Sequence, residues 1–332
     1  MIGWLRTAAG NAGALALLPL SAVPMLLVGP SLVHSHSRFQ RAYDSAPHAA
    51  PAVLFTPATV ARYTRVAPFR GAIPVLTYHG INANNDRYSV SREEFARQMA
   101  MLDLSGYRSI TIDQFLRFRR GDTAGLPPRP ILITFDDGRL DSYRGADRIL
   151  ERHRFSAAMY VITGPMQEGN PFYLTWRELH RMRDSGRWDI QPHAADGHRE
   201  IVTDPDGTMA PFYANRRFTR STGLETFPAY TQRVASDIYE LQDDFRRQDI
   251  PSETFAVPFG DHGQNAKDQR IPRFLDDLLA TQFRVVFVQS PGNDPRYTRP
   301  TGAALRYEVH TDTTTDALRS WLVRHNPGER SA

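Results

Sequence analysis

The chain has 332 residues, of which 41% are hydrophobic and 23% are charged, so it can bury a sizeable core and is not expected to be disordered. Its formal net charge is only +4, and its arginines are scattered among acidic residues, which argues against a nucleic-acid partner. It contains no cysteine, so disulfides, thiolate metal ligands and a cysteine nucleophile are excluded, and any metal must be held by His, Asp or Glu.

Residues 1–33 are predicted to form a membrane-inserting segment, either a signal anchor or a signal peptide. Residues 7–33 carry no charged side chain, which suits a membrane span of about 20 residues better than the ~7–15-residue apolar region of a signal peptide. Arg6 precedes this stretch, and Arg38 and Arg41 follow it, so the flanking charges do not set its orientation. The chain is therefore expected to reach the membrane through its N-terminal part.

Residues 34–72 are predicted to form a linker, because they are rich in Ala, Pro, His and Arg and show no sustained apolar period. From Ile73 onward, short apolar runs alternate with longer amphipathic segments, the pattern of parallel strands joined by helices, so residues 73–332 are predicted to be the folded domain. About eight strands in ~260 residues predict an α/β fold, an irregular TIM-like (β/α) barrel of seven or eight strands, with a doubly wound open sheet as the alternative. The expected strands are residues 73–78, 109–112, 131–135, 157–162, 188–191, 254–257, 285–288 and 305–309.

Two of the segments between these strands carry separate helix signals. Ser91 and Glu94 have the spacing of a capping box ahead of an apolar periodic stretch, which predicts the start of a helix. Residues 230–247 are acidic and amphipathic, which also predicts a helix.

The strand expected at residues 131–135 ends abruptly in Asp136, Asp137 and Gly138. In an α/β barrel the carboxyl ends of the strands form the active-site face, so these acids are expected where a substrate binds. Successive side chains at a strand end point in different directions, so one Asp can bind a metal while the other transfers a proton. An ordinary Asp-Asp-Gly turn is the alternative interpretation.

A second polar loop follows the strand expected at residues 188–191 and contains His193 and His198. A separation of five residues does not place both rings on one helix face, but it suits a loop that folds two imidazoles onto one ion. Neutral His together with carboxylate favours one divalent metal ion, most often zinc, with a position left open for water. Surface histidines without a ligand are the alternative.

Two further strands end in the same way. His79 follows the first expected strand, and Pro258, Phe259 and Gly260 follow the run 254–257 as a fixed turn that could present a backbone N–H to an oxyanion. The alternative for the first feature is a hydrogen-bonded structural His, and the alternative for the second is a core strand that ends in an ordinary turn. Because all four features fall at strand carboxyl ends, we expect them to share one site.

These motifs resemble the polysaccharide deacetylase family, also called carbohydrate esterase family four or the NodB homology domain. Residues 134–138 (TFDDG) are identical to the first motif of the family, which implies that Asp136 is the catalytic base and Asp137 a metal ligand. His193 and His198 resemble the histidine pair that completes the metal triad. Their five-residue spacing is similar to the branch that deacetylates poly-N-acetylglucosamine.

That branch places its general-acid histidine after an early strand ending in Tyr-His, as at Tyr78 and His79, which implies that His79 is the acid. The rival is His310, which stands where the ordinary motif order puts a late histidine. The ordinary motif is Leu-x-Leu-His, and residues 306–310 (RYEVH) depart from it.

The third motif of the family, Arg-x-Pro-Tyr, is incomplete in this chain. Residues 256–259 (AVPF) lack both the Arg and the Tyr hydroxyl, so the resemblance does not say what orients Asp136. The turn at Pro258 and the main-chain N–H of Phe259 can still serve an oxyanion. The resemblance extends from residue 73 to about residue 323 and says nothing of residues 1–72.

The resemblance implies a metal-dependent hydrolase that removes N-acetyl groups from an extracellular polysaccharide such as poly-N-acetylglucosamine. In that reaction the metal activates water and the acetyl carbonyl, Asp136 takes a proton from the water, and His79 protonates the sugar amine. Tyr78 and Trp176 could stack on sugar rings or belong to the core.

Two other functions remain open from the sequence. The same chemistry serves an O-acetyl esterase acting on xylan or cell-wall sugars, and a membrane-tethered polysaccharide-binding module without activity is a third reading. The expected location is the cell membrane with the catalytic domain outside the cytoplasm, or secretion if the N-terminal segment is cleaved. A glycosyltransferase or secretion machinery is a possible partner for the resembling branch.

Overall fold

The structure, a computed structural model, describes residues 49–64, 71–84, 86–264, 266, 268–289, 298–300 and 302–325. The predicted membrane-inserting segment and the first part of the predicted linker lie outside these residues. Within the part of the chain that is described, no helix is long and apolar enough to cross a bilayer. The membrane segment therefore stays a prediction.

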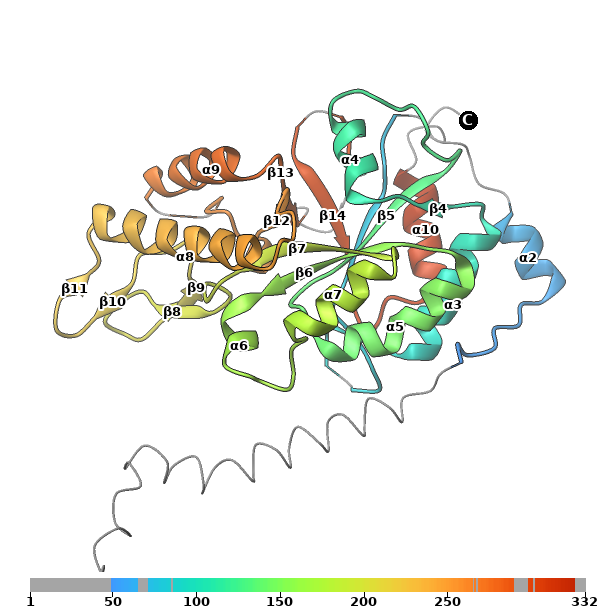
Figure 1. Cartoon of the computed structure of the whole chain (residues 1–332), viewed down its shortest axis with the longest axis horizontal. Helices are drawn as coiled ribbons and strands as arrows, with labels where there is room; N and C mark the ends of the chain where they lie inside the picture. The colour runs from blue at the N-terminus through green and yellow to red at the C-terminus, as the bar shows by residue number, and fades with distance from the viewer. Residues whose placement is uncertain are drawn as a thin grey trace, which may run out of the picture. The chain divides into compact units, whose positions relative to one another are not determined.

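The described strands include one parallel eight-stranded sheet (Figure 1). Seven of its strands pair in the order β12-β13-β14-β1-β5-β6-β7, while the short β4 pairs with the start of β5. Their bounds are β1 Val75–Tyr78, β4 Arg108–Ser109, β5 Pro130–Phe135, β6 Ala157–Ile162, β7 Trp188–Ala194, β12 Thr254–Ala256, β13 Val285–Gln289 and β14 Ala304–Glu308.

This strand order is that of a barrel. Along the chain each of the seven strands is followed by its spatial neighbour, and the last strand, β14, pairs in parallel with the first, β1. A doubly wound sheet would instead reverse its order at a switch point. The predicted irregular (β/α) barrel is confirmed in this respect, and the open-sheet alternative is wrong.

Side chains bridge the barrel between β7 and β12, two strands that form no ladder with each other in the described residues. The Gln191 side-chain oxygen on β7 accepts hydrogen bonds from the N–H of Thr254 at 2.8 Å and from its hydroxyl at 2.9 Å. It also accepts from the N–H of Glu253 at 3.2 Å. Further along, the Nδ1 of His193 donates to the carbonyl oxygen of Ala256 at 2.7 Å. These hydrogen bonds satisfy backbone groups of residues 253–256 that a β-ladder between β7 and β12 would otherwise pair.

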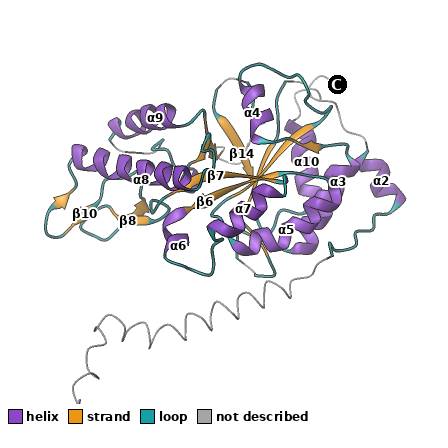
Figure 2. Ribbon diagram, in the orientation of Figure 1, coloured by secondary structure: helices purple, strands orange, loops and turns teal. Residues whose placement is uncertain are grey.

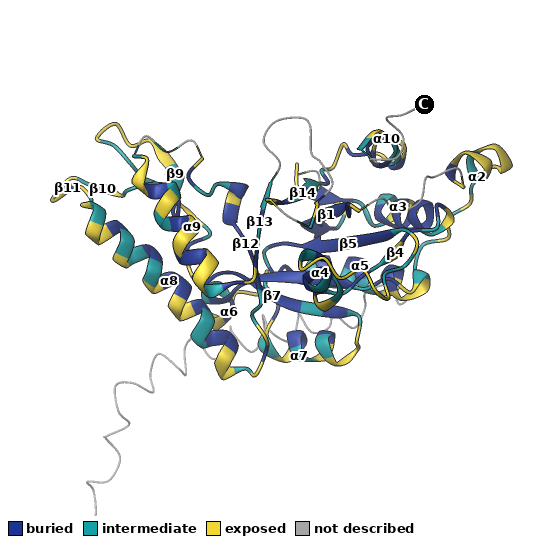
Figure 3. Ribbon diagram, turned by 90° about the horizontal axis from the view of Figure 1, so that it is seen from above, coloured by how far each residue is buried: buried dark blue, intermediate teal, exposed yellow. Residues whose placement is uncertain are grey.

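Helices surround the barrel strands (Figures 1 and 2). Their bounds are α2 Pro57–Tyr63, α3 Arg92–Leu104, α4 Ile112–Arg119, α5 Leu140–His153, α6 Thr163–Gln167, α7 Trp176–Asp184, α8 Phe227–Arg247, α9 Arg270–Gln282 and α10 Thr315–His325. Every residue of β5 and β6 is buried, as expected for parallel strands covered on both faces. Figure 3 shows this buried strand layer, and exposed residues along the outer face of α8.

One expected strand and one expected cap differ from the prediction. The run 109–112 is a strand only at Ser109, because Thr111 and Gln114 form a complete capping box that starts α4 at Ile112. Ser91 does cap α3 through its hydroxyl, but the Glu94 carboxylate does not return to the cap. It accepts instead from the N–H and hydroxyl of Thr315 at 2.5 and 2.7 Å, which ties α3 to the start of α10.

The described part of the predicted linker contains a helix that contacts the folded domain. Thr56 caps α2, and Pro57 occupies its first turn. Tyr63, at the end of this helix, is buried, and its hydroxyl donates to Asp316 of α10 at 2.8 Å. Residues 49–64 therefore pack as an extension of the barrel's helical layer.

Two short hairpins are inserted between β7 and α8. They consist of β8 Glu200–Val202 with β9 Met209–Pro211, and of β10 Phe218–Thr219 with β11 Gly223–Leu224. A smaller insertion, β2 Gly80–Ile81 with β3 Ser89–Val90, follows β1. Both insertions leave the barrel at strand carboxyl ends, where the candidate site lies.

Candidate active site

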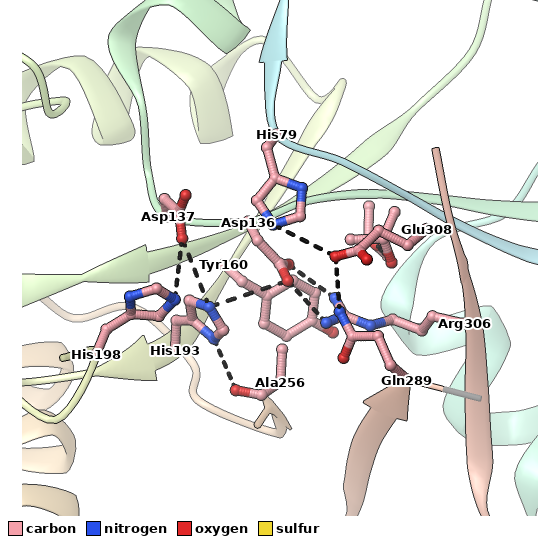
Figure 4. A network of polar contacts seen from close by, with 12 residues as sticks. His79, Asp136, Asp137, Tyr160, His193, His198, Ala256, Gln289, Arg306 and Glu308 are labelled. Atoms are coloured by element: carbon pink, nitrogen blue, oxygen red, sulfur yellow. Dashed lines mark hydrogen bonds and ion pairs between the residues drawn. The ribbon is translucent and has the colours of Figure 1, made fainter. Parts of the chain in front are cut away.

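Three of the four sequence features, His79, the Asp136–Asp137 pair and the two histidines of the loop after β7, meet at the carboxyl ends of the barrel strands (Figure 4). The fourth, the turn Pro258–Gly260, adjoins them through the ring contact of Phe259 with His198. Figure 4 shows Asp137, His193 and His198 on one side of Asp136, and Arg306 and Glu308 on the other. The residues come from β1, β5, β7 and β14 and from the loops that follow them. The site thus has one group formed by Asp137, His193 and His198 and a second group formed by Arg306 and Glu308, with Asp136 between them.

Asp137, His193 and His198 form a donor set of the kind that binds one metal ion. The Oδ1 atom of Asp137 lies 3.7 Å from Nε2 of His193 and 3.4 Å from Nε2 of His198, and one ligand atom from each residue lies within 4.8 Å of the others. That Asp137 oxygen is buried and has no hydrogen-bond partner among the described residues. A buried carboxylate oxygen without a donor fits a cation, so the residues present fit a divalent metal.

The backbone at Asp137 is held in an unusual conformation. Its φ is +73°, in the left-handed region that side chains other than glycine rarely adopt. Gly138, which follows it, also has a positive φ of 69°. This turn places two successive carboxylates in different directions, so Asp137 faces the histidines while Asp136 faces the barrel interior.

The orientation of His193 leaves its Nε2 atom free for a ligand role. Because its Nδ1 donates to the Ala256 carbonyl, the lone pair of the neutral ring lies on Nε2, which faces Asp137. Burial lowers the pKa of His193 to about 4, although the Asp136 carboxylate acts in the opposite direction. The ring is therefore neutral near pH 7, the form that binds metals.

The loop between the two histidines is fixed by α8. The carboxylate of Asp237 accepts hydrogen bonds from the N–H of Ala195 at 3.2 Å and of Asp196 at 2.8 Å. It also accepts one from the hydroxyl of Tyr213. The five-residue spacing is thus accommodated by a loop whose backbone is anchored at its centre.

Asp136 is buried and paired with an arginine, Arg306, that none of the sequence motifs contains. Nη1 and Nη2 of Arg306 donate to the two carboxylate oxygens of Asp136, each at 2.7 Å. Burial alone would raise the pKa of Asp136, but the charge and hydrogen bonds of Arg306, together with His193, hold it well below its usual range. Asp136 is therefore an anion of fixed orientation. The third motif has Ala256 in place of its arginine, and Arg306 of β14 supplies the missing guanidinium group.

A signal for Arg306 was present in the sequence. Arg306 and Glu308 stand two residues apart in the expected strand 305–309, so their side chains must lie on the same face of that strand. Two charges on one face of a barrel strand require partners. The sequence does not say which residue on another strand would pair with them.

Glu308 lies between the two histidines that compete for the general-acid role. Its Oε1 is 3.9 Å from Nε2 of His79, and its Oε2 is 2.8 Å from Nε2 of His310. His79 is buried, its carbonyl oxygen accepts from the Ser142 hydroxyl at 2.5 Å, and its Nδ1 has no partner in the described residues. The Nε2 atom of His79 is directed toward the carboxylates of the site (Figure 4), whereas that of His310 is engaged by Glu308. This geometry favours His79 as the acid.

The remaining predicted site residues fall in two groups. Pro258 is buried in the short 3-10 turn Pro258–Gly260, and Phe259 has a φ of +59° and a ring stacked on His198 at 4.6 Å between centroids. Tyr78 is 0% exposed, packs against Phe95 and Phe135, and donates to Gln98. The expectation that Tyr78 contacts sugar is therefore wrong, because its whole ring lies in the core.

Trp176 packs against another helix and has no ring contact with the residues of the candidate site in the described part of the chain. It begins α7, is half-buried, and packs edge-to-face on Phe245 of α8 at 5.8 Å between ring centroids. Its ring thus serves the packing of two helices.

Comparisons with known proteins agree with this arrangement. Residues 123–270 match the family model described as Polysaccharide deacetylase. The chain is 24% identical over 212 residues to a poly-β-1,6-N-acetyl-D-glucosamine N-deacetylase of Escherichia coli (strain K12), covering 58% of this chain and 31% of that protein. It is 31% identical over 114 residues to the Staphylococcus aureus (strain MRSA252) protein of the same name, covering 33% and 39%. The match thus spans 31% of the length of the first relative and 39% of the length of the second.

The fold is similar to that of a solved deacetylase. The de-N-acetylase from Aggregatibacter actinomycetemcomitans superposes with a TM-score of 0.65 at 17% identity, covering 75% of this chain and 99% of that one. At this identity the similarity concerns the fold. Together with the family match and the named homologues, it leads to one conclusion: the chain resembles the polysaccharide deacetylase family, and within that family the branch of the poly-N-acetylglucosamine deacetylases.

Proposed function

We propose that this protein is a metal-dependent deacetylase that removes N-acetyl groups from a β-1,6-linked N-acetylglucosamine polymer outside the cytoplasm. One observation carries the proposal. A carboxylate anion, Asp136, is held by two hydrogen bonds from Arg306 directly beside the donor set formed by Asp137, His193 and His198. An oriented base next to a metal-ligand cluster is the arrangement by which a metal-assisted hydrolase activates water against an amide.

Asp137, His193 and His198 would hold the ion, and zinc is the ion that this set of two neutral histidines and one carboxylate favours. When bound, a divalent ion there would supply Lewis acidity to the acetyl carbonyl and to a water molecule. The protein contributes neutral imidazoles for this purpose, because burial and the Ala256 carbonyl keep His193 uncharged with Nε2 available.

The other steps depend on the side chains of the chain itself. Asp136 accepts the proton of the attacking water, since its low pKa keeps it ionised and Arg306 fixes its direction. The N–H of Phe259 stabilises the oxyanion from the turn that follows β12. His79 then protonates the nitrogen of the departing sugar amine, which releases acetate.

The names of the homologues support the choice of polymer. The uncharged stretch at residues 7–33 supports the proposed location. A membrane attachment at the N-terminus would place the catalytic domain close to a polysaccharide as it leaves the cell. A glycosyltransferase or export complex would then be the natural partner of the enzyme.

The test is acetate release by the full chain from a β-1,6-linked N-acetylglucosamine pentamer, with and without chelator. We expect release that depends on added divalent metal and falls at least 100-fold in Asp136→Asn, which keeps the size of the side chain and removes the base. Asp243→Asn, on the exposed side of α8, is the matched control and should behave as the wild type. Hydrolysis of O-acetylated xylan without release from the pentamer would replace the proposal with an esterase. Metal binding without turnover of either substrate would favour a silent binding module.

A further inference from the structure

Tyr88 is a large aromatic side chain that stays 43% exposed beside the candidate general acid. Its ring lies 5.1 Å from the ring of His79 and 5.7 Å from that of His310, measured between centroids. One part of the Tyr88 ring therefore contacts the histidines, while the rest faces solvent. An exposed tyrosine on the rim of a site is a candidate for contact with a substrate.

Hydrogen bonds of the backbone hold the segment that carries Tyr88. The ring therefore keeps its position although it is partly exposed. The N–H of Tyr88 donates to the Asp86 carboxylate at 2.9 Å, and its carbonyl oxygen accepts from the N–H of Gly80 at 3.1 Å. On the other side, the carbonyl oxygen of Arg87 accepts from the N–H of Thr311 at 2.9 Å. The ring is thus presented on a fixed support between β1 and the end of β14.

The chemistry of the reaction defines which part of the substrate lies near Tyr88. A general acid protonates the nitrogen that remains on the sugar, so the sugar ring must lie on the His79 side of the scissile bond. The acetyl group lies on the opposite side, toward the donor set of Asp137, His193 and His198. Tyr88 is the exposed aromatic side chain whose ring adjoins His79 in the described residues.

We propose that Tyr88 binds the sugar ring that bears the scissile acetamide, by stacking its exposed face on the apolar face of that hexosamine. The proposal rests on the proposed function and adds a residue for recognition of the sugar. Tyr88 acts in binding and does not take part in proton transfer. Its contribution is specific for substrates that carry a pyranose ring next to the acetyl group.

The experiment compares two acetylated substrates, the β-1,6-linked N-acetylglucosamine pentamer and an aryl acetate that has no sugar ring. We expect Tyr88→Ala to raise KM for the pentamer about tenfold, the effect of losing one aromatic stacking contact and its buried area. The ratio of kcat/KM for the pentamer to kcat/KM for the aryl acetate should fall by a similar factor. Tyr88→Phe, which keeps the flat ring, should keep that ratio within about twofold.

Tyr239→Ala is the matched control, because this tyrosine is 52% exposed on α8. An unchanged KM for the pentamer in Tyr88→Ala would overturn the proposal. An equal loss on both substrates would also overturn it, since Tyr88 would then act by shaping His79. Equal midpoints of thermal unfolding for the variants and the wild type show that the comparison concerns folded proteins.

Failure of the proposed function is seen in the wild type alone, as the absence of acetate release from the pentamer. The role of Tyr88 is then read from binding by calorimetric titration of the pentamer into the full chain and into Tyr88→Ala. A dissociation constant about tenfold higher in Tyr88→Ala supports the sugar contact. Equal constants, or no binding by the wild type, overturn it.

Discussion

Arg306 is the residue on which the state of Asp136 depends most directly. Both of its terminal nitrogens are bonded to the two oxygens of that carboxylate, and neither side chain is exposed to solvent to any extent. A bidentate guanidinium fixes both the charge and the direction of a carboxylate, whereas an ammonium group fixes only the charge. The two effects can therefore be separated by substitution.

Arg306→Lys should lower kcat/KM about 100-fold, because a small misplacement of a catalytic group has an effect of this order. Arg306→Gln removes the cation as well. The pKa of Asp136 then rises, so the base becomes protonated at a higher pH, and the acidic limb of the pH profile should move up by at least about one unit. The measurement is kcat/KM against pH for both variants. Arg148→Lys, in an exposed pair with Glu151, is the control. An acidic limb at the same pH in Arg306→Gln would contradict this role.

The spacing of His193 and His198 is a second residue-scale feature with a structural basis. The sequence shows two histidines five apart, and the fold supplies the anchor that brings both rings to Asp137. Spacing alone is equally compatible with two surface histidines. Asp237 anchors the loop that brings the two rings together, and it lies more than 35 residues downstream on α8.

At the scale of elements, α8 supports through Asp237 the loop between His193 and His198, the two candidate metal ligands. The N–H groups of Ala195 and Asp196 donate to different oxygens of Asp237, and Asp237→Asn replaces one of these oxygens by an NH₂ group, which cannot accept a hydrogen bond, so one of the two bonds is lost. We expect the affinity for divalent metal to fall about 10- to 100-fold. Calorimetric titration of zinc into the metal-free chain measures this effect, with Asp243→Asn on the exposed side of α8 as the control. Wild-type affinity in Asp237→Asn would show that the loop needs no anchor.

The bridge between β7 and β12 is a second feature of this scale. Gln191 accepts three hydrogen bonds from the start of β12, and these take the place of ladder bonds between the two strands. Gln191→Ala would leave those buried donors without an acceptor. The free energy of unfolding should fall by about 1–3 kcal/mol.

Urea denaturation measures the loss in Gln191→Ala. Gln269→Ala, at an exposed position before α9, should change the free energy of unfolding by no more than about 0.5 kcal/mol. If Gln191→Ala were equally mild, the barrel would not depend on this bridge.

At the scale of the whole molecule, metal binding should be coupled to the stability of the fold. The three candidate ligands, Asp137, His193 and His198, come from the turn after β5 and from the end of β7 and the loop after it, so an unfolded chain does not hold them together. A metal present at 100 times its dissociation constant would add about 2.7 kcal/mol to the free energy of unfolding, a rise of roughly 5–10 °C in the midpoint for a domain of this size.

Thermal unfolding of the full chain with zinc and with chelator tests this coupling without any substrate. His198→Ala should lose most of the difference between the two conditions, because it removes one ligand and leaves the two donors that are more buried. A difference as large in His198→Ala as in the wild type would place the metal elsewhere.

The sequence by itself determined the α/β alternation, most strand positions and the polar residues at the strand ends. It could do so because these signals are local: a buried parallel strand is a short apolar run, and a charge at its end is conspicuous. The run 131–135 followed by Asp136 and Asp137 needs no knowledge of the rest of the chain. The signal for Ser91 as a helix cap is also local, and the structure confirms that Ser91 caps α3.

Only the tertiary structure decided which distant residues serve these groups. Arg306 is separated from Asp136 by 170 residues, and it reaches that carboxylate because the closed strand order brings β14 beside β1 and β1 beside β5. In the same barrel Tyr78 is buried, and the Glu94 carboxylate accepts a hydrogen bond from the N–H of Thr315 and not from the N-cap residue Ser91. Period and composition define which face of a strand a residue occupies, but the partner opposite that face follows from the register and closure of the whole barrel.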